Sequence, residues 1–529
     1  MRQILLFLLF LSVIFSKEIT LDFLNSKPKS IYKDYYIWRY LDQNITSETA
    51  LKLLGDTKRV NKKLFIKFAK KINDKSYKKI LKCYKMKPKE FLKSDADCIK
   101  IGLSVYDATK LSNHDLKLID KKIIQIYPKL HNIYQIILSK KPFLKLIQSN
   151  KDTFFDTFNN TGSLYREKNF NRPIDKKYLQ KLEKEKNFNQ TVKLIVTDKK
   201  LDNLQKSILD INSSKLSADT NFFLFLNSIK YNKKNLAKRY LDLAEKKFYF
   251  RFDKDKILFW RYLVWKDLDA LYKLTTSFDI NLYSLYAKEK LGVKLSNIKI
   301  LKKCEDTKPS IDITKPFKWL GILNMINSND TNLTQLATRF KSCRELPVKA
   351  FILERKNYKS LNYFIIPYKK YLKNYDKDRQ ALMLAIARQE SRFIPSSISS
   401  SYALGMMQFM PFLAYATAKQ KKIKDFDLDD IFKPKIAYSF AYMHIKYLQK
   451  KLKYPLFVAY AYNGGIGFTK RMLKAGFFKN GKYEPFMSME LVPYNESKRY
   501  AKKVLSNYVV YKNILGEKIG IRTLLKMLK

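Results

Sequence analysis

The sequence predicts an all-α protein built from successive amphipathic helices, and three observations support this fold class. Only 13 Gly and 15 Pro occur in 529 residues, which argues against a β protein rich in tight turns. Apolar residues recur at helical spacing, as in 232–248, where lysines occupy the opposite face. Hydrophobic residues make up 46% of the chain, which is enough to build cores rather than a disordered polymer.

The first residues are typical of a secretory signal peptide. Met1 and Arg2 precede an apolar run from Ile4 to Phe15, and Ser16 follows it. A helix of that length spans about 18 Å, which is too short to cross a bilayer core of about 30 Å. The sequence therefore predicts a signal peptide at 1–16, an exported chain, and no transmembrane span in the mature protein. An uncleaved anchor is the alternative.

The four cysteines fit an exported protein. They form two sequence-local pairs, Cys83 with Cys98 and Cys304 with Cys343. In an oxidising compartment these pairs are the natural disulfides. Four buried thiols are one alternative; a zinc site is a weaker one, since no Cys-x-x-Cys spacing occurs.

Glycine usage divides the chain into two parts. Residues 1–350 hold 5 of the 13 Gly, and residues 351–529 hold the other 8. Glycine is scarce where helix follows helix, and common where loops approach a ligand. The first part therefore predicts an α-solenoid, and the second part is where we expect the chemistry.

The net charge of +57 is spread evenly along the chain. Residues 351–529 carry 34 basic and 12 acidic residues, a net of +22, and the first 350 residues carry the remaining +35. A nucleic-acid interface concentrates its charge on one face or domain. The even spread favours a general compositional bias, so we expect no nucleic acid among the partners.

A candidate acid lies at the end of an apolar helix. Residues 381–387 are all apolar, which predicts a buried helix, with Asp376 or Asp378 as its N-cap. Glu390 follows three residues later, near the helix C-terminus. The negative end of the helix dipole and apolar surroundings both favour a protonated carboxyl group, as a general acid for glycosidic cleavage requires. A solvated helix-end glutamate is the alternative.

Three motifs in order give this segment a family resemblance. Glu-Ser at 390–391 is followed by Gly-Met-Met-Gln-Phe-Met-Pro at 405–411 and by Ala-Tyr-Asn-Gly-Gly at 461–465. Their order and spacing resemble the soluble lytic transglycosylases, and the similar stretch covers about 363–510. Further similar stretches are 430–434, 489–493 and 495–500, and a weaker one is 282–292. The chain departs from the family pattern at Tyr402, Met406 and Lys498.

The resemblance implies a three-domain organisation and an activity. A ring-like α-superhelical domain would occupy 17–290, a small helical linker domain 291–360, and a lysozyme-like catalytic domain with minor β structure 361–529. The implied reaction cleaves the β-1,4 bond between N-acetylmuramic acid and N-acetylglucosamine in peptidoglycan, leaving a 1,6-anhydro end. We accordingly expect a monomeric periplasmic enzyme, associated with the cell wall or outer membrane, without cofactor or metal. Its partners would be glycan strands, with other cell-wall enzymes as further candidates.

The resemblance also implies roles for individual residues. Glu390 would protonate the leaving oxygen and then accept the C6 proton, and Tyr462 would hydrogen-bond near it. No acidic residue lies between Glu390 and Asp425, which suits a site with one carboxylate. The expected substrate-binding residues are Ser399, Gly405, Met407, Gln408, Met410, Asn463 and Glu496, and Glu490 is a weaker candidate.

Several alternatives remain open at this stage. A hydrolytic muramidase would need a second carboxylate, which Asp425–Asp430 or Glu496 could supply. A scaffold that binds the wall without cleaving it would not need the set Glu390, Gln408 and Tyr462. The run from Asp425 to Asp430 resembles the start of a calcium loop, but Asp430 stands where Gly is required, and Ile436 where Glu is.

Overall fold

The computed structural model describes residues 18–358 and 360–528, and helices dominate them, which confirms the predicted all-α class. Strands β1 (Ile298–Ile300) and β2 (Asn362–Phe364) pair in parallel, with Ile298 opposite Asn362. The predicted signal peptide at 1–16 lies outside the described residues. Within the described part, no helix combines the length and apolar character that spanning a bilayer requires.

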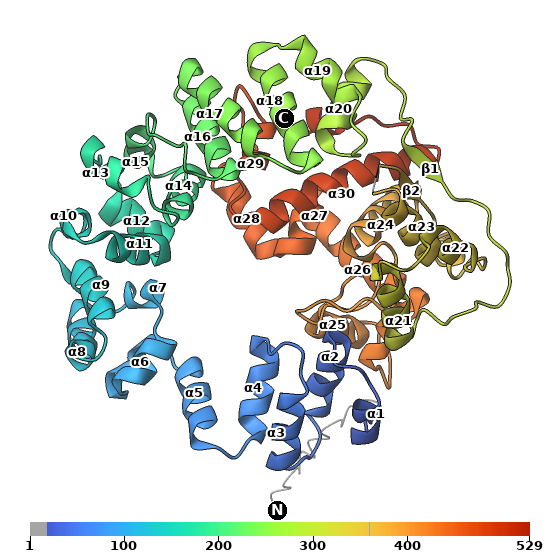
Figure 1. Cartoon of the computed structure of the whole chain (residues 1–529), viewed down its shortest axis with the longest axis horizontal. Coiled ribbons are helices and arrows are strands. Elements are labelled where there is room, and N and C mark those ends of the chain that lie inside the picture. Colours follow the sequence, from blue (N-terminus) through green and yellow to red (C-terminus); the bar gives the residue numbers. More distant parts are fainter. Residues whose placement is uncertain (1–17, 359, 529) are drawn as a thin grey trace, which may run out of the picture. The chain divides into compact units, whose positions relative to one another are not determined.

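The chain forms two compact units, each assembled from separate stretches of sequence (Figure 1). Unit 1 comprises the described residues up to Lys71 together with 294–467 and 500–521, and unit 2 comprises 72–293, 468–499 and 522–528. The unit boundary at 293–294 lies near the predicted boundary at 290, and residues 18–71 group with the segment that carries Glu390. The three-domain division stays a prediction.

Unit 1 contains both strands and the helices nearest the candidate acid. Its α-helices are α1 (Leu21–Asn25), α2 (Ile31–Tyr40), α3 (Ser47–Gly55), α4 (Lys62–Lys71), α21 (Pro316–Asn327), α22 (Leu333–Thr338), α23 (Leu346–Lys356), α24 (Lys377–Ser391), α25 (Pro411–Gln420), α26 (Pro434–Leu452) and α27 (Pro455–Gly464). Its 3-10 helices are η2 (Lys369–Tyr371) and η3 (Leu428–Phe432). The division between the units falls within α28 (Ile466–Lys474), α30 (Asn495–Ile514) and α31 (Ile521–Lys526).

Unit 2 is a succession of helices. Its α-helices are α5 (Lys75–Lys85), α6 (Ala96–Gly102), α7 (Val105–Ala108), α8 (Asn113–Ile123), α9 (Pro128–Leu138), α10 (Pro142–Gln148), α11 (Lys151–Asn160), α12 (Ser163–Phe170), α13 (Lys176–Leu182), α14 (Phe188–Thr197), α15 (Asp202–Ser207), α16 (Ala218–Lys230), α17 (Lys234–Lys247), α18 (Arg251–Trp265), α19 (Leu268–Thr275), α20 (Leu282–Lys290) and α29 (Phe486–Leu491). The 3-10 helix η1 (Pro88–Lys93) lies between α5 and α6.

Aromatic and aliphatic side chains fill the core of unit 2. Trp260 of α18 is fully buried, and its ring lies 5.5 Å from Phe225 of α16, centroid to centroid. On α17 the buried residues are Ala237, Tyr240, Leu241 and Ala244, the face that the periodicity of 232–248 predicts. The aromatic positions in this part of the chain therefore serve packing.

Two disulfides join neighbouring segments. Cys83 of α5 is bonded to Cys98 of α6, and Cys304 is bonded to Cys343. The predicted pairing is thus confirmed. Each bond closes a short loop and restricts the unfolded chain, which stabilises the folded unit.

Helix α24 forms the centre of unit 1. Residues Ala381–Ala387 have no exposed surface, so this helix is buried on every side, as its sequence predicts. Helix α30 packs against it, since the side-chain amide of Asn507 donates to the carbonyl of Ala385 at 3.4 Å (Figure 1). A helix buried on all sides holds the residues at its end in a fixed place.

The N-terminal helices of unit 1 hold its acidic loop. Arg39 of α2 donates to Asp427 at 2.5 Å and to Asp429 at 2.7 Å. Asp430 forms an ion pair with Lys433 at 2.7 Å. These contacts give the acidic run 425–430 a structural role. The sequence already argues against a calcium site in this run.

Candidate functional site

Glu390 is half-buried and lies one residue before the end of α24. The helix begins at the N-cap Asp376, whose side chain accepts from the backbone N–H of Arg379 at 2.9 Å. It ends at Arg392, whose φ of 55° is left-handed and cannot continue the helix. The start of the helix follows a local sequence signal, the capping residue Asp376, whereas its end at Arg392 does not.

Tyr500 is a hydrogen-bond partner of the Glu390 carboxyl group. Its hydroxyl, on α30, donates a hydrogen bond to Oε1 of Glu390 at 2.7 Å. The Tyr500 side chain is buried, so this hydrogen bond is shielded from water. The sequence did not predict this contact. The stretch 495–500 resembles the family, and that was the one signal pointing to Tyr500.

Tyr462 lies near Glu390, but its hydroxyl bonds elsewhere. Placed on α27, it donates to the backbone carbonyl of Met407 at 2.8 Å. Burial, and next the charge of Glu390, raise the pKa of Tyr462 well above its usual value of 10.0. The Tyr462 phenol is therefore protonated and neutral near neutral pH. It links α27 to the motif at 405–411.

His444 is a neutral neighbour of this group. Burial lowers its pKa from 6.5 to about 4, so the imidazole is uncharged near neutral pH. Its ring packs edge-on against Tyr462, with centroids 5.5 Å apart, and against Phe409 at 6.3 Å. His444 thus contributes an aromatic ring next to Tyr462 and no positive charge.

The loop after α24 folds back on itself and presents Ser399 and Gln408. The backbone N–H of Ala403 donates to Ser399 Oγ at 2.9 Å, and Gln408 Nε2 donates to the carbonyl of Gly405 at 2.8 Å. Gly405 has φ of 75°, and a Cβ there would lie 2.8 Å from the Ile431 carbonyl oxygen. A side chain at 405 would therefore be strained and would clash with the backbone, so this glycine permits a close approach.

The remaining predicted site residues occupy different environments. The Met407 side chain is fully buried. Its backbone carbonyl accepts the hydrogen bond from the Tyr462 hydroxyl. Met410 is the N-cap residue of α25, and Asn463 lies at the end of α27; both are half-exposed.

The two acidic candidates near the C-terminus belong to unit 2 rather than unit 1. Glu496 is exposed in the first turn of α30. Glu490 is buried in α29 and accepts a hydrogen bond from the Tyr283 hydroxyl. The structure thus gathers Glu390, Tyr462 and the motif at 405–411 within one unit, and leaves these two glutamates in the other.

A cavity of about 550 Å³ within unit 1 is lined in part by Glu390. Helix α2 contributes Tyr32, helix α21 contributes Trp319 and Asn324, and the loop after α24 contributes Ser397. Among the described residues that line it, Glu390 is the one carboxylic acid. The lining thus combines aromatic, amide and hydroxyl groups, and it also contains two cations, Lys58 and Arg392.

The described residues hold no cluster of His, Cys, Asp or Glu that could bind a metal ion.

Residues 367–484 match the family model described as the transglycosylase SLT domain. We refer to this matched segment, residues 367–484, as the SLT domain. The matched segment carries Glu390, Gln408 and Tyr462, and it confirms the family resemblance that the motifs predict. Tyr500 lies beyond the segment matched to the SLT domain.

The chain also resembles proteins of known name. It is 29% identical over 141 residues to the soluble lytic murein transglycosylase of Salmonella typhimurium, and 28% identical over 160 residues to that of Escherichia coli K12. These alignments cover 26% and 29% of this chain. They span 21% and 24% of the relatives, so the matched segment is about a fifth to a quarter of their length.

The fold likeness extends beyond the SLT domain. The crystal structure of the 70 kDa soluble lytic transglycosylase SLT70 from Escherichia coli matches with a TM-score of 0.50 and 16% identity. The match covers 95% of this chain and 89% of that chain. At this identity the likeness shows a shared fold.

Proposed function

We propose that this protein is a lytic transglycosylase that cleaves the β-1,4 bond between N-acetylmuramic acid and N-acetylglucosamine in peptidoglycan. The observation that carries the proposal is the cavity lined by Glu390 as its one carboxylic acid among the described lining residues. The SLT domain and its named relatives supply the substrate class.

In this mechanism Glu390 acts twice. Its carboxyl group first donates a proton to the glycosidic oxygen, which leaves as the hydroxyl of the departing strand. The C6 hydroxyl of the muramic acid then attacks C1, and the Glu390 carboxylate accepts the C6 proton. The product carries a 1,6-anhydro ring, and Glu390 returns to its starting state. Because the substrate supplies the nucleophile, no second carboxylate is needed, unlike in ordinary glycosidases.

The neighbouring residues would orient the acid and the sugar. The Tyr500 hydroxyl holds Oε1 of Glu390 at 2.7 Å and so acts as a positioning residue. Ser399, Gln408 and Asn463 would bind polar substrate groups, Met410 would pack against a sugar face, and Gly405 and Met407 would shape the backbone near the sugar. Tyr462 would be a neutral hydrogen-bonding group near the reaction centre.

A digest of purified sacculi, followed by mass spectrometry, tests the reaction type. We expect muropeptides with 1,6-anhydro ends, which are lighter by one water than hydrolysed ends. Reducing muramic ends without anhydro ends would instead establish a muramidase. Binding to sacculi without any released product would favour a non-catalytic scaffold.

Removing the Tyr500 hydroxyl tests its positioning role. Because a hydrogen bond to a charged group contributes more than a neutral one, Tyr500→Phe should lower kcat about tenfold or more, with KM changed by less than about twofold. Steady-state release of soluble muropeptides measures both constants. The matched control is Tyr511→Phe, a tyrosine of the same helix whose hydroxyl donates to the Ile365 carbonyl at 3.1 Å. Equal kcat values for the two variants would contradict the role.

We also propose that the protein works in the periplasm. The two disulfides form and persist in an oxidising compartment, which supports export. Peptidoglycan is reached only by an exported chain. The predicted signal peptide is consistent with this location, and N-terminal sequencing of the mature protein would test it.

A further inference from the structure

A second cavity, of about 990 Å³, lies within unit 2 and is surrounded by lysines. It is formed by α5, η1 and the start of α6, far in sequence from the SLT domain. We call it the lysine cavity. Its basic lining residues are Lys79, Lys82, Lys85, Lys89 and Lys93.

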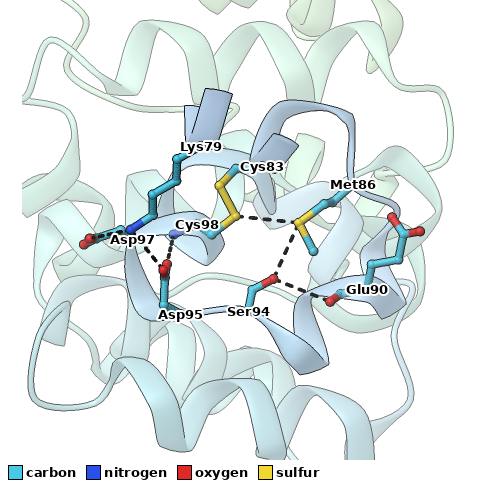
Figure 2. Close-up of a disulfide and its surroundings, with 8 residues drawn as sticks. All are labelled: Lys79, Cys83, Met86, Glu90, Ser94, Asp95, Asp97 and Cys98. Carbon is cyan, nitrogen blue, oxygen red and sulfur yellow. Dashed lines mark hydrogen bonds and ion pairs between the residues drawn. A yellow bond between two sulfur atoms is a disulfide. The ribbon is translucent and has the colours of Figure 1, made fainter. Parts of the chain in front are cut away.

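Most of this positive charge is uncompensated. Lys79 forms ion pairs with Asp95 at 2.9 Å and with Asp97 at 3.4 Å (Figure 2). The other four lysines are exposed, and none has an ion-pair partner among the described residues. Against five lysines the lining contains two acidic residues, Glu90 and Asp95, so it carries a net charge of +3.

Three of the lysines are neighbours along one helix. Lys79, Lys82 and Lys85 follow one another at intervals of three on α5, whereas Lys89 and Lys93 lie on the 3-10 helix η1. Like charges three residues apart on an α-helix repel one another, which destabilises the free protein. A bound anion would relieve that repulsion.

A disulfide fixes the wall of the lysine cavity. Cys83, between Lys82 and Lys85 in sequence, is bonded to Cys98 on α6, and Figure 2 shows Met86 and Ser94 grouped around this bond. The sulfur of Met86 lies 3.6 Å from that of Cys98. The link keeps α5 and α6 together before a ligand arrives, so less ordering is required when one binds.

We propose that the lysine cavity binds the carboxylates of peptidoglycan stem peptides, an inference that rests on the proposed function. Lysine ammonium groups are compact point charges that accept carboxylates in many geometries. No aromatic ring is available among the described lining residues for stacking a base, and carboxylates are the anions that the proposed substrate carries on its stem peptides. An acidic peptide therefore fits better than a nucleic acid, and the vesicle experiment below distinguishes it from a lipid phosphate.

Sedimentation with sacculi tests the inference independently of catalysis. All proteins would carry Glu390→Gln so that the sacculi stay intact. The test variant adds Lys82→Gln, Lys85→Gln, Lys89→Gln and Lys93→Gln. The matched control adds the same change at four exposed lysines of unit 2 outside this cavity, namely Lys181, Lys184, Lys246 and Lys254.

The test variant should bind native sacculi about tenfold more weakly than its parent at low salt, since each exposed ion pair contributes only a small factor. The control should stay within about twofold of the parent, and 1 M salt should remove the difference. Replacing the same four lysines of the cavity with arginine should preserve binding, because the charge is retained. Equal losses in the test and control variants would overturn the inference.

Altered ligands identify the anion. An amidase removes the stem peptides from the glycan. The parent protein should then bind the stripped glycan about tenfold more weakly than native sacculi. The test variant should bind the stripped glycan and native sacculi equally well. Undiminished parent binding to stripped glycan would overturn the inference. The inference would also be overturned if the test variant lost more binding to anionic phospholipid vesicles, or to duplex DNA, than to sacculi. That result would mean that the cavity binds phosphates.

The two proposals fail separately. If the active protein releases anhydro products but the test variant binds sacculi as well as its parent, only the proposal that the lysine cavity binds stem peptides is overturned. Stem-peptide-dependent binding without any released product would overturn the proposed reaction alone.

Discussion

Glu390→Gln should lower the rate of muropeptide release by a factor of about 10² to 10⁴, the contribution usual for a general acid or base. The amide keeps the size of the carboxyl group, and its oxygen can still accept the Tyr500 hydrogen bond. The amide cannot donate a proton to the glycosidic oxygen at a useful rate. The free energy of unfolding should therefore stay within about 1 kcal/mol of the parent, because no cavity or unpaired charge is created. Release from sacculi and a urea titration measure the two effects.

A matched change elsewhere separates chemistry from charge. Glu48 is exposed in the first turn of α3 in the same unit, and Glu48→Gln should leave the release rate unchanged. If the Glu390→Gln protein is folded and keeps more than a tenth of the parent rate, Glu390 is not the acid. A folded and inactive variant that still sediments with sacculi would show that binding and cleavage are separable.

Local sequence signals were sufficient for the helix that carries the acid. The unbroken apolar run predicts burial of 381–387, and Asp376 caps the helix as expected. Each of these features depends on residues within a few positions of one another. The same holds for the disulfide partners Cys83 and Cys98, which lie 15 positions apart. Interactions between residues close together in sequence are therefore enough to predict the helix that carries Glu390.

Contacts between distant parts of the chain could not be predicted in this way. Tyr500 lies 110 positions after Glu390, and Arg39 lies 388 positions before its partner Asp427. Nothing near either residue in sequence marks its partner, because tertiary packing brings the partners together.

Tyr402 shows how a departure from the family pattern is accommodated. Its φ is 62°, a conformation that favours glycine. The ring is fully buried and packs against Trp38 of α2, with centroids 5.6 Å apart. The neighbouring loop is tied to the same N-terminal part, since Asn61 donates to the carbonyl of Ser400 at 2.9 Å. Packing against these helices offsets the strain of the left-handed backbone.

Removal of the Glu354 carboxylate should be the most destabilising single change near the site. Glu354 accepts from Arg388 at 2.5 Å, and the side chains of the two residues are 8% and 3% exposed. Arg388 is on α24, two positions before Glu390. Glu354→Ala would leave a buried guanidinium without its counter-charge, which typically costs about 3–5 kcal/mol. A urea titration near neutral pH would measure this loss in the free energy of unfolding.

The pH dependence of stability provides an independent check on the same pair. Burial alone would raise the pKa of Glu354, but the charges of Arg388 and Arg392 outweigh burial and hold the pKa below its usual value of 4.5. A lowered pKa means that the carboxylate stabilises the fold above pH 4.5 and that this contribution is lost as the pH falls through the folded-state pKa. The Glu354→Ala protein should therefore lose less stability than the parent on acidification through that range.

An apolar replacement of both partners distinguishes a lost charge pair from lost packing. Glu354→Leu combined with Arg388→Met removes both charges and keeps most of the volume, so it should recover much of the stability that Glu354→Ala loses. If the double variant is no more stable than Glu354→Ala, the loss comes from the Glu354 hydrogen bond to the Tyr363 backbone and from packing, since both variants lack them. If it recovers, the unpaired guanidinium was the cause, and the ion pair holds the end of α24, and with it Glu390, in place.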